Sequence, residues 1–269
     1  MSGANLIVTP AHRDTVAVVT GGAQGVGRAI AERLLADGCT KMVLVGRDQA
    51  KGERAAHEMT QSHQAEVRFH AADLGDAQAA IGAVDFAADA FGRVTALANA
   101  AGLSDRGSVL DTSPDLWDKL MNVNARGPFF MLQRLAQLAV QNRHKATCVT
   151  VLSTALHVGN SFLAPYSASK AAMSTVTKNA AMALRDKGVR VNAIAPGWMD
   201  TEGEDVVQRK WHGAGDDWLE QAEAGAPMGM LVKPAHLAEL ASYMLGPNSG
   251  VMTGAVVDFD QFVPGVYPE

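Results

Sequence analysis

Short apolar runs alternate along the chain with longer segments in which apolar residues recur every three or four positions. The runs are rich in Val, Leu and Ala, as is typical of strands buried on both faces of a parallel sheet. They cover residues 16–20, 42–45, 67–70, 96–99, 148–152 and 189–194. The segments with helical periodicity are 27–36, 49–61, 77–91, 114–141 and 165–187. This alternation predicts an α/β fold, a doubly wound parallel sheet with helices on both faces.

Prolines and glycines refine the helix boundaries. Ser113 can cap a helix whose first turn contains Pro114, and Pro165 can open the helix that follows. Gly127 and Pro128 interrupt the long middle segment, so we expect two helices there or a bent one.

The chain reads as a single domain over residues 14–262. Residues 1–13 are expected to be a flexible leader, and residues 263–269 a C-terminal tail. The segment from about residue 199 to residue 226 is polar, glycine-rich and contains two tryptophans, which favours a mobile flap over a core element.

Composition and charge exclude several classes of protein. The chain is 48% apolar and has 23 basic against 28 acidic residues, a net charge of −5 that disfavours a nucleic-acid surface. No apolar run approaches the ~18–20 residues that span a bilayer, so we expect no membrane segment and a cytoplasmic location. Cys39 and Cys148 are too few for a disulfide framework. The histidines are too irregularly spaced to predict a metal site.

A glycine-rich turn, Thr-Gly-Gly-Ala-Gln-Gly-Val-Gly over residues 20–27, directly follows the first predicted strand and precedes a helix. Glycines allow the backbone to turn sharply and to approach a pyrophosphate closely. The helix N-terminus then presents free N–H groups and the positive end of its dipole to the anion. The position of this turn predicts a dinucleotide-binding site.

A phenol and an ammonium group stand four residues apart at Tyr166 and Lys170, on one face of a predicted helix. Ser153 lies thirteen residues before Tyr166, at the carboxyl end of a predicted strand. Ligands bind outside the carboxyl ends of strands in doubly wound sheets, where the glycine turn also lies. Because a nearby ammonium lowers the pKa of a phenol from its usual ~10, this group can exchange protons near neutrality.

The spacing Thr-Gly-x-x-x-Gly-x-Gly, together with Tyr-x-x-x-Lys, resembles the short-chain dehydrogenase/reductase family. The resemblance runs from about residue 14 to residue 260. Further matching positions are Asp73 and Leu74 after the third strand, Asn99, Ala100 and Gly102 after the fourth, Asn124 on a helix, and Pro196, Gly197, Met199 and Thr201 after the sixth. One departure is Ala100, which replaces the second Asn of the family's Asn-Asn-Ala-Gly element.

The resemblance implies a Rossmann-like sheet of about seven strands and a nicotinamide cofactor. Beyond the matching positions, it assigns cofactor contacts to Gly21, Gln24, Gly25, Val26, Gly27, Arg47, Tyr166 and Lys170. It implies that Tyr166 is the general acid/base, that Lys170 tunes its pKa and anchors a ribose, and that Ser153 binds the substrate oxygen. Asn124 would hold a water that relays protons. A homotetramer is the family expectation.

The end of the second strand bears on the choice of cofactor. Gly46 stands where NAD-dependent members of the family have Asp, and Arg47 follows, as is typical of NADP users. Gln24, where NADP users often have a basic residue, and Asp48, which could contact the ribose, leave NAD open. The sequence therefore favours NADP over NAD.

The substrate is predicted only as a class. The candidate substrate residues are Ser104, Asp105, Arg106, His157, Asn160, Trp198, Met199 and Glu202. Their polarity favours a small hydroxylated molecule such as a sugar or polyol, because buried polar groups need partners. A 3-oxoacyl thioester reductase is the alternative, and a non-catalytic cofactor-binding protein is a third. Where the family commonly ends Asp-Gly-Gly, Asp260 is followed by Gln261 and Phe262, near an expected subunit interface.

Overall fold

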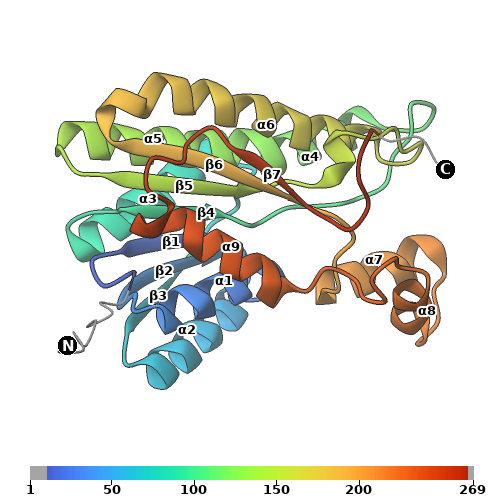
Figure 1. The fold of residues 1–269 in the computed structure, drawn as a ribbon, viewed down its shortest axis with the longest axis horizontal. Helices are drawn as coiled ribbons and strands as arrows, with labels where there is room; N and C mark the ends of the chain where they lie inside the picture. The colour runs from blue at the N-terminus through green and yellow to red at the C-terminus, as the bar shows by residue number, and fades with distance from the viewer. Residues whose placement is uncertain (1–10, 266–269) are drawn as a thin grey trace, which may run out of the picture.

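The computed structural model describes residues 11–265, which contain a seven-stranded sheet (Figure 1). The strands are β1 (Val16–Thr20), β2 (Lys41–Gly46), β3 (Glu66–Ala71), β4 (Ala96–Asn99), β5 (Ala146–Val151), β6 (Val189–Pro196) and β7 (Val256–Phe259). Their order is β3-β2-β1-β4-β5-β6-β7, and all neighbouring strands are parallel. The strand order reverses between β1 and β4, so the carboxyl ends of these two strands flank a topological switch point.

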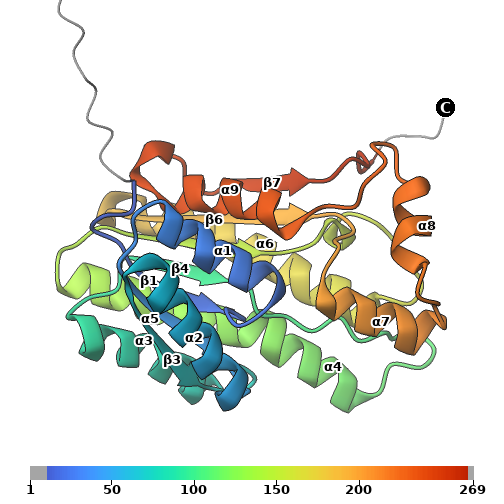
Figure 2. The ribbon, with the colours of Figure 1, turned by 90° about the horizontal axis from the view of Figure 1, so that it is seen from below.

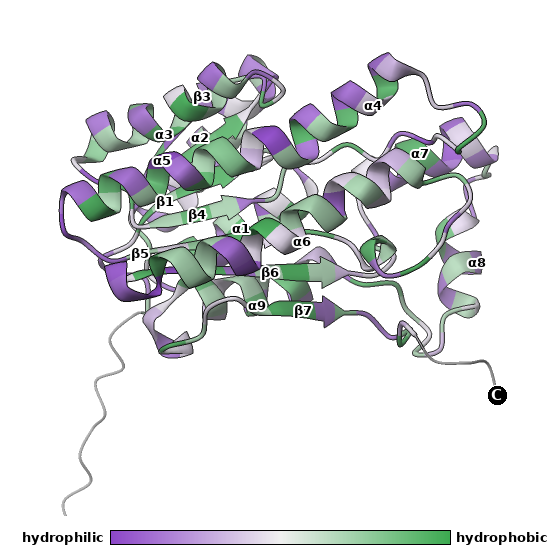
Figure 3. Cartoon of the chain, turned by 90° about the horizontal axis from the view of Figure 1, so that it is seen from above, coloured by the Kyte–Doolittle hydropathy of each residue, from purple (hydrophilic) through white to green (hydrophobic). Residues whose placement is uncertain are grey.

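Helices cover both faces of this sheet. They are α1 (Gly25–Ala36), α2 (Gln49–His63), α3 (Ala77–Phe91), α4 (Pro114–Met121), α5 (Gly127–Gln141), α6 (Ala164–Leu184), α7 (Glu202–His212), α8 (Trp218–Ala224) and α9 (Pro234–Leu245). One apolar cluster packs α1, α2 and α9 on one face, and a second packs α3, α5 and α6 on the other (Figure 1). The strands are mostly apolar, whereas helices such as α3 and α5 alternate polar and apolar faces (Figure 3). This is the predicted Rossmann-like, doubly wound fold.

The predicted strands are confirmed, with ends that differ by at most two residues. Helices α1, α2 and α3 are confirmed in the same way, and α6 ends three residues before the predicted end at 187. Strand β7 and helix α9 are not among the predicted elements. Strand β7 is a four-residue edge strand that includes Asp258, so its apolar run is too short to stand out.

The interruption predicted at Gly127 and Pro128 is confirmed as a change of helix type. A π-helical turn, Asn122–Arg126, joins α4 to α5 and contains the buried Asn124. A Cβ on Gly127 would lie 2.2 Å from the Leu74 carbonyl oxygen, so glycine allows α5 to approach this backbone. Single π-turns inside helices are frequent at functional sites.

The flap region carries two helices that the sequence analysis did not identify, α7 and α8, beyond the carboxyl ends of the strands (Figures 1 and 2). Trp218 of α8 is buried against Ala226 and Leu231, and its ring stacks on that of Trp198 at a centroid distance of 6.2 Å. The segment therefore has a small apolar core of its own. Gly213 and Gly215 in the loop between the helices interrupt their periodicity in the sequence.

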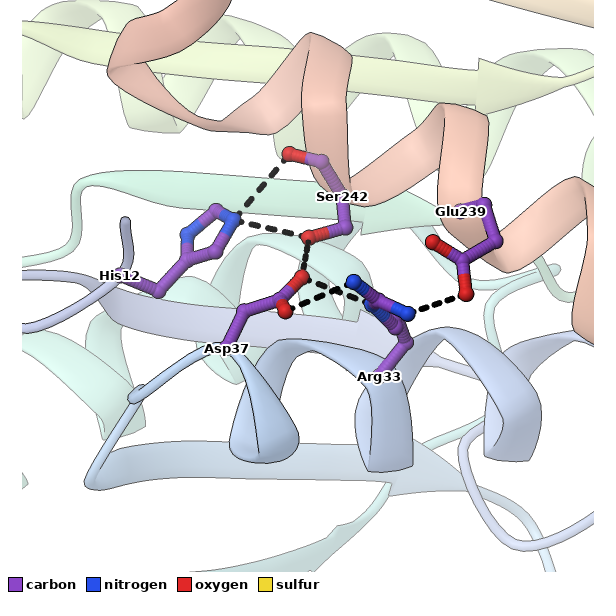
Figure 4. A network of polar contacts seen from close by, with 5 residues as sticks. All are labelled: His12, Arg33, Asp37, Glu239 and Ser242. Carbon is purple, nitrogen blue, oxygen red and sulfur yellow. Dashed lines mark hydrogen bonds and ion pairs between the residues drawn. The ribbon is translucent and has the colours of Figure 1, made fainter. Parts of the chain in front are cut away.

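His12, in the last part of the predicted leader, packs against the domain. Residues 1–10 lie outside the described part of the chain, but His12 is completely buried. Its Nε2 lies 3.0 Å from the Ser242 hydroxyl, which donates to Asp37, and Asp37 pairs with Arg33 (Figure 4). Arg33 also contacts Glu239. These contacts fasten the chain before β1 to α1 and α9, so the ordered domain begins before residue 14.

Cys39 and Cys148 are free thiols and are buried in the core. Burial raises the pKa of the Cys39 thiol to about 11 and that of Cys148 to about 12. Both therefore remain neutral thiols inside the core at neutral pH.

Between residues 11 and 265, every helix is too short or too polar to cross a membrane.

Candidate active site

The glycine turn lies between the carboxyl ends of β1 and β4. The Thr20 hydroxyl oxygen accepts hydrogen bonds of 3.0 Å from the backbone N–H groups of Ala100 and Ala101, which ties the two strand ends together. A Cβ on Gly27 would lie 2.4 Å from the Gly21 carbonyl oxygen, so only glycine allows α1 to start this close to the turn.

The first turn of α1 is free to receive an anion. Gly21 and Gly25 adopt positive φ values of 68° and 50°, which turn the backbone toward the helix start. Gln24 is the N-cap of α1, and its side chain does not cap the helix. The N–H groups at this helix end and the helix dipole therefore face the groove beside the turn, an arrangement that suits a pyrophosphate.

This groove, which we call the cofactor groove, has a volume of about 360 Å³. Predicted cofactor residues that line it are Gly21, Gln24, Gly25, Val26, Gly27, Arg47, Asp73, Leu74, Ala100, Gly102 and Thr201. Lining residues that the sequence analysis did not assign to the cofactor include Val45, Lys51, Phe69, Ala72, Leu103 and Val123. The groove thus runs along the carboxyl ends of β1, β2, β3 and β4.

Asn99 matches the family motif but does not line the groove. Its side chain is buried, and Nδ2 donates to the Pro128 carbonyl oxygen at 3.4 Å. The side chain therefore braces β4 against α5, and its predicted contact with the cofactor has no support in this geometry. A sequence motif identifies the residue but not the side of the strand to which it points.

The turn Pro196-Gly197 lies at the end of β6, outside the lining of the cofactor groove. A Cβ on Gly197 would lie 2.1 Å from the Asp260 carboxylate, so this glycine leaves room for the acid. Asp260 also accepts a hydrogen bond of 3.2 Å from Thr154. Met199, two residues beyond the turn, pairs with Val232 and does not line the groove.

Charged groups gather where β2 meets the groove. Asp48 is the N-cap of α2, because its carboxylate accepts a hydrogen bond of 3.0 Å from the Lys51 N–H. This oxygen is therefore engaged in capping the helix and not in a contact with a ribose. The Lys51 ammonium contacts the Gln24 side chain and lies 3.5 Å from Glu202 of α7. Lys51 therefore places a positive charge beside Gln24, the position where the sequence lacked one. Its signal was weak, because a lysine on a helix surface is common.

Ser153, Tyr166 and Lys170 come together beyond the end of β5. Ser153 follows the strand, and its hydroxyl lies close enough to the phenol of Tyr166 to lower the pKa of that group. The Lys170 ammonium lies 5.7 Å from the centroid of the Tyr166 ring. It donates to the Val151 carbonyl oxygen at 2.9 Å, which holds it beneath the ring.

Burial shifts the pKa of both Tyr166 and Lys170. Burial raises the pKa of the Tyr166 phenol, while the nearby Ser153 hydroxyl lowers it. Burial lowers the pKa of Lys170 to about 8, so this side chain is still mostly protonated at pH 7. Its positive charge is then available to a phenolate at Tyr166.

Asn124 braces the site from the π-helical turn. Its Oδ1 accepts from the Leu103 N–H at 2.8 Å, and its Nδ2 donates to the Leu103 carbonyl oxygen and to Ser169. Ser169 in turn donates to the carbonyl oxygen of Tyr166 at 2.6 Å. Both amide hydrogens of Asn124 are thus used to join the loop after β4 to α6, and the predicted water relay stays a prediction.

A family model described as short chain dehydrogenase matches residues 15–211, which include the glycine turn and all four catalytic candidates. The chain belongs to the short-chain dehydrogenase family. Relatives extend the match beyond residue 211 to nearly the whole chain.

Two relatives illustrate the range of the family. The chain is 33% identical over 255 residues to an NADP-dependent (R)-specific alcohol dehydrogenase of Lentilactobacillus kefiri, covering 93% of this chain and 98% of the relative. It is 28% identical over 249 residues to a galactitol 2-dehydrogenase of Agrobacterium fabrum, covering 91% and 95%. Among solved structures, a variant of actinorhodin polyketide ketoreductase with NADPH superposes with a TM-score of 0.86 at 26% identity, covering 95% of this chain and all of that one.

As a short-chain dehydrogenase, the chain is an NAD(P)-dependent oxidoreductase that acts on an alcohol or carbonyl group. The NADP-dependent relative and the NADPH-bound neighbour support the choice of NADP over NAD that Arg47 indicated. The residues fit such a cofactor, because the groove combines a glycine turn, an uncapped helix start and two cations, Arg47 and Lys51.

Several of the predicted substrate residues form hydrogen bonds within the protein. Trp198 donates to Glu204 of α7 at 2.8 Å, and the Ser104 carbonyl oxygen accepts from Arg106. His157 pairs with Asp258 of β7 at 2.8 Å in an exposed contact, so its place among the candidate substrate residues loses support. Asn160 caps the turn before Phe162, since its side chain accepts from the Phe162 N–H.

The departure at the C-terminus has a clear role in the flap. The side chain of Gln261 accepts from the Met228 N–H at 2.7 Å and donates to the Met230 carbonyl oxygen at 2.8 Å. These bonds fasten the segment after α8 to the end of the sheet. A glycine, the common family residue, could not make them.

Proposed function

We propose that Tyr166 is the general acid/base of this oxidoreductase, which acts on a small polar alcohol or the matching carbonyl compound. The observation that carries this assignment is the arrangement of Ser153, Tyr166 and Lys170 beside the cofactor groove. A Cβ on Gly102, which lines the groove, would lie 3.3 Å from the Lys170 ammonium. The proton-handling residues and the groove therefore share an edge.

Each of the three residues has a separate task. A nicotinamide, when bound, supplies or accepts the hydride. Tyr166 donates a proton to the carbonyl oxygen during reduction and removes it from the hydroxyl during oxidation. Lys170 stabilises the phenolate through its charge, and Ser153 holds the substrate oxygen next to the phenol.

Tyr166→Phe tests this assignment. Because the phenylalanine keeps the ring but loses the hydroxyl, turnover should fall by at least about 10³-fold, within the range of general acid/base catalysis. The affinity for NADPH, followed by fluorescence, should change less than about twofold, since Tyr166 lies outside the lining of the cofactor groove. Substantial turnover by this variant would refute the role of Tyr166.

The substrate class is proposed on the basis of the polar residues near Tyr166 and the similarity to the galactitol dehydrogenase. A second candidate is the reduction of a 3-oxoacyl thioester, which uses the same catalytic residues and gains support from the similarity to a ketoreductase. A panel of polyols, sugars and an acetoacetyl thioester, assayed with both cofactors, separates the two. No turnover of any compound, together with tight cofactor binding, would favour a non-catalytic protein.

We also propose a homo-oligomer, a tetramer by family resemblance, in the cytoplasm. An apolar groove between α5 and α6 supports a second copy as the occupant of this face, with Leu132, Ala136 and Ala180 in its lining and Phe129 and Val140 exposed at its rim. Sedimentation of the full chain tests the assembly, and Val140→Glu should dissociate it. A monomer at micromolar concentration would refute the proposal.

A further inference from the structure

The backbone places Arg106 next to the start of α6, which carries Tyr166. Gly107 pairs with Leu163 as an isolated parallel bridge. Its N–H donates to the Phe162 carbonyl oxygen at 2.9 Å, and its carbonyl oxygen accepts from Ala164 at 3.0 Å. The residue before Gly107 is therefore held beside the residues that precede Tyr166.

The guanidinium of Arg106 is mostly buried and makes few hydrogen bonds. Only 12% of the side chain is exposed, and it lies 5.5 Å from the centroid of the Phe162 ring. It donates to the Ser104 carbonyl oxygen at 2.9 Å and lies 3.4 Å from Nε2 of His212. Its Nε is buried without a partner among the described residues. Since buried donors are normally satisfied, this group has unused capacity to bind.

Glu204 of α7 faces this guanidinium from the flap. One carboxylate oxygen accepts from the Trp198 ring N–H at 2.8 Å and from the Gln208 amide at 2.6 Å, and lies 4.0 Å from Arg106. The other oxygen makes no hydrogen bond with any residue in the described range. Glu204 therefore offers a free acceptor oxygen on a carboxylate whose other oxygen lies 4.0 Å from Arg106.

Both charges reach the catalytic phenol. The negative charge of Glu204 raises the pKa of Tyr166, and the positive charge of Arg106 lowers it. Arg106 is thus linked to the Tyr166 region both by the bridge of Gly107 with Leu163 and by its charge, and Glu204 faces Arg106 from α7. We call Arg106, Phe162, Trp198, Glu204 and His212 the substrate mouth.

On the basis of the function proposed above, we propose that Arg106 and Glu204 together bind a second hydroxyl group of the substrate, vicinal to the one that reacts. A hydroxyl can accept from a guanidinium and donate to a carboxylate at the same time. The pair therefore selects vicinal diols and the matching hydroxyketones.

The charges around the mouth favour a hydroxyl over a carboxylate. A substrate carboxylate that pairs with Arg106 would come close to the negative charge of Glu204, and like charges in a partly buried site repel strongly. Glu204 is itself fixed by Trp198 and Gln208, so it does not move aside without the loss of two hydrogen bonds. A neutral hydroxyl meets neither obstacle.

Matched substrates test the proposal on the full chain. The probes are butane-2,3-diol, butan-2-ol, which lacks the second hydroxyl, and 3-hydroxybutyrate, which carries a carboxylate. Arg106→Met and Glu204→Gln should each lower kcat/KM for the diol by about tenfold or more, mainly through KM, as for the loss of a charged hydrogen-bond partner. The same ratio for butan-2-ol should fall by less than about threefold.

The pH profile supplies a readout that a merely structural role would not change in this way. Glu204→Gln removes a charge that raises the pKa of Tyr166, so the profile of kcat/KM should shift to lower pH. Arg106→Met should shift it to higher pH. Matched controls are Glu220→Gln in α8 and Arg54→Met in α2, both exposed and outside the substrate mouth. NADPH affinity and the thermal midpoint identify any variant that fails to fold.

Two results would overturn the proposal. One is an equal loss for butan-2-ol and the diol. The other is a preference for 3-hydroxybutyrate that Arg106→Met abolishes and Glu204→Gln increases. This result would mean that Arg106 binds a substrate carboxylate and not a hydroxyl group. Neither affects the role of Tyr166, because turnover of butan-2-ol by the unmodified protein and its loss in Tyr166→Phe are measured separately.

Discussion

The cofactor groove and the substrate mouth both lie near the Ser153, Tyr166 and Lys170 site but are built in different ways. The groove is formed largely by main chain, with a glycine turn, an uncapped helix start and the ends of four neighbouring strands. The mouth is formed by side chains from the loop after β4, from the segment before α6, from the turn after β6 and from α7. A main-chain site tolerates few changes of residue, whereas a side-chain site can be altered one residue at a time.

The difference explains how one fold serves several substrates. The groove is anchored by buried strands, and its shape depends on close contacts that only glycine allows. The mouth is stabilised by polar contacts between segments that lie outside the sheet. Glu204, for example, contacts Trp198 and Arg106. The relatives named above share the family but act on different alcohols, as expected if the mouth varies while the groove is kept.

Gly27→Ala should break the groove and give the largest effect. A Cβ would lie 2.4 Å from the Gly21 carbonyl oxygen, so α1 must move away from the turn. We expect about a 100-fold weaker affinity for NADPH, because the N–H groups at the start of α1 would no longer point toward the pyrophosphate. The free energy of unfolding should fall by about 1–3 kcal/mol, as for other overpacked sites. Fluorescence titration and urea unfolding measure the two effects.

Gly82→Ala in α3 is the matched control, because a Cβ there meets no atom within 4 Å. This variant should bind NADPH normally and gain up to about 1 kcal/mol of stability from the better helix propensity of alanine. Equal cofactor affinities of the two variants would contradict a main-chain origin of the groove.

Lys51→Met sharpens the comparison within the groove, where one contact is proposed to come from a side chain. If Lys51 and Arg47 bind the 2′-phosphate, the Kd for NADP should rise about tenfold, and that for NAD by less than about twofold. The lost pair with Glu202 is exposed and adds little. Titration with both cofactors measures the ratio.

Lys41→Met, an exposed change at the opposite end of β2, is the control and should leave both affinities unchanged. A uniform loss for NADP and NAD in Lys51→Met would mean that Lys51 attracts anions in general. In that case the preference for NADP would depend on Arg47 alone.

The same distinction governs what the sequence could predict. Gly21, Gly25 and Gly27 were found because backbone geometry demands glycine at a fixed spacing after a strand. Lys51 was missed because nothing in a helical lysine shows that its ammonium lies beside Gln24. Residue type alone does not determine where a long side chain ends.

Two further residues show the limits of motifs and of periodicity. Asn99 was assigned to the cofactor by its motif, yet its side chain turns toward α5. In the sequence, Arg106 is one of several polar candidate residues. Only the pairing of Gly107 with Leu163 places it beside the start of α6. Such tertiary contacts join segments far apart in the chain, and local periodicity carries no information about them.

The His12 network (Figure 4) precedes the amino end of β1, whereas the groove and the mouth lie beyond the carboxyl ends of the strands, so this network should change stability and leave both sites intact. Burial lowers the pKa of His12, so the folded protein binds a proton less readily than the unfolded chain. The free energy of unfolding should therefore decrease as pH falls below the unfolded value of about 6.5, by at most about 1.4 kcal/mol per pH unit. The loss ends once pH drops below the folded pKa of His12.

His12→Gln isolates this contribution, because glutamine can still bond to Ser242 but does not titrate. Asp37, also in the network, has a lowered pKa, and its contribution is lost only in more acidic solution than the range from pH 5 to 7. Urea unfolding of both proteins across that range should show a slope that the variant lacks, with equal kcat/KM at pH 7. Parallel stability curves would contradict a neutral His12, and a change in kcat/KM would show that this face is coupled to the active site.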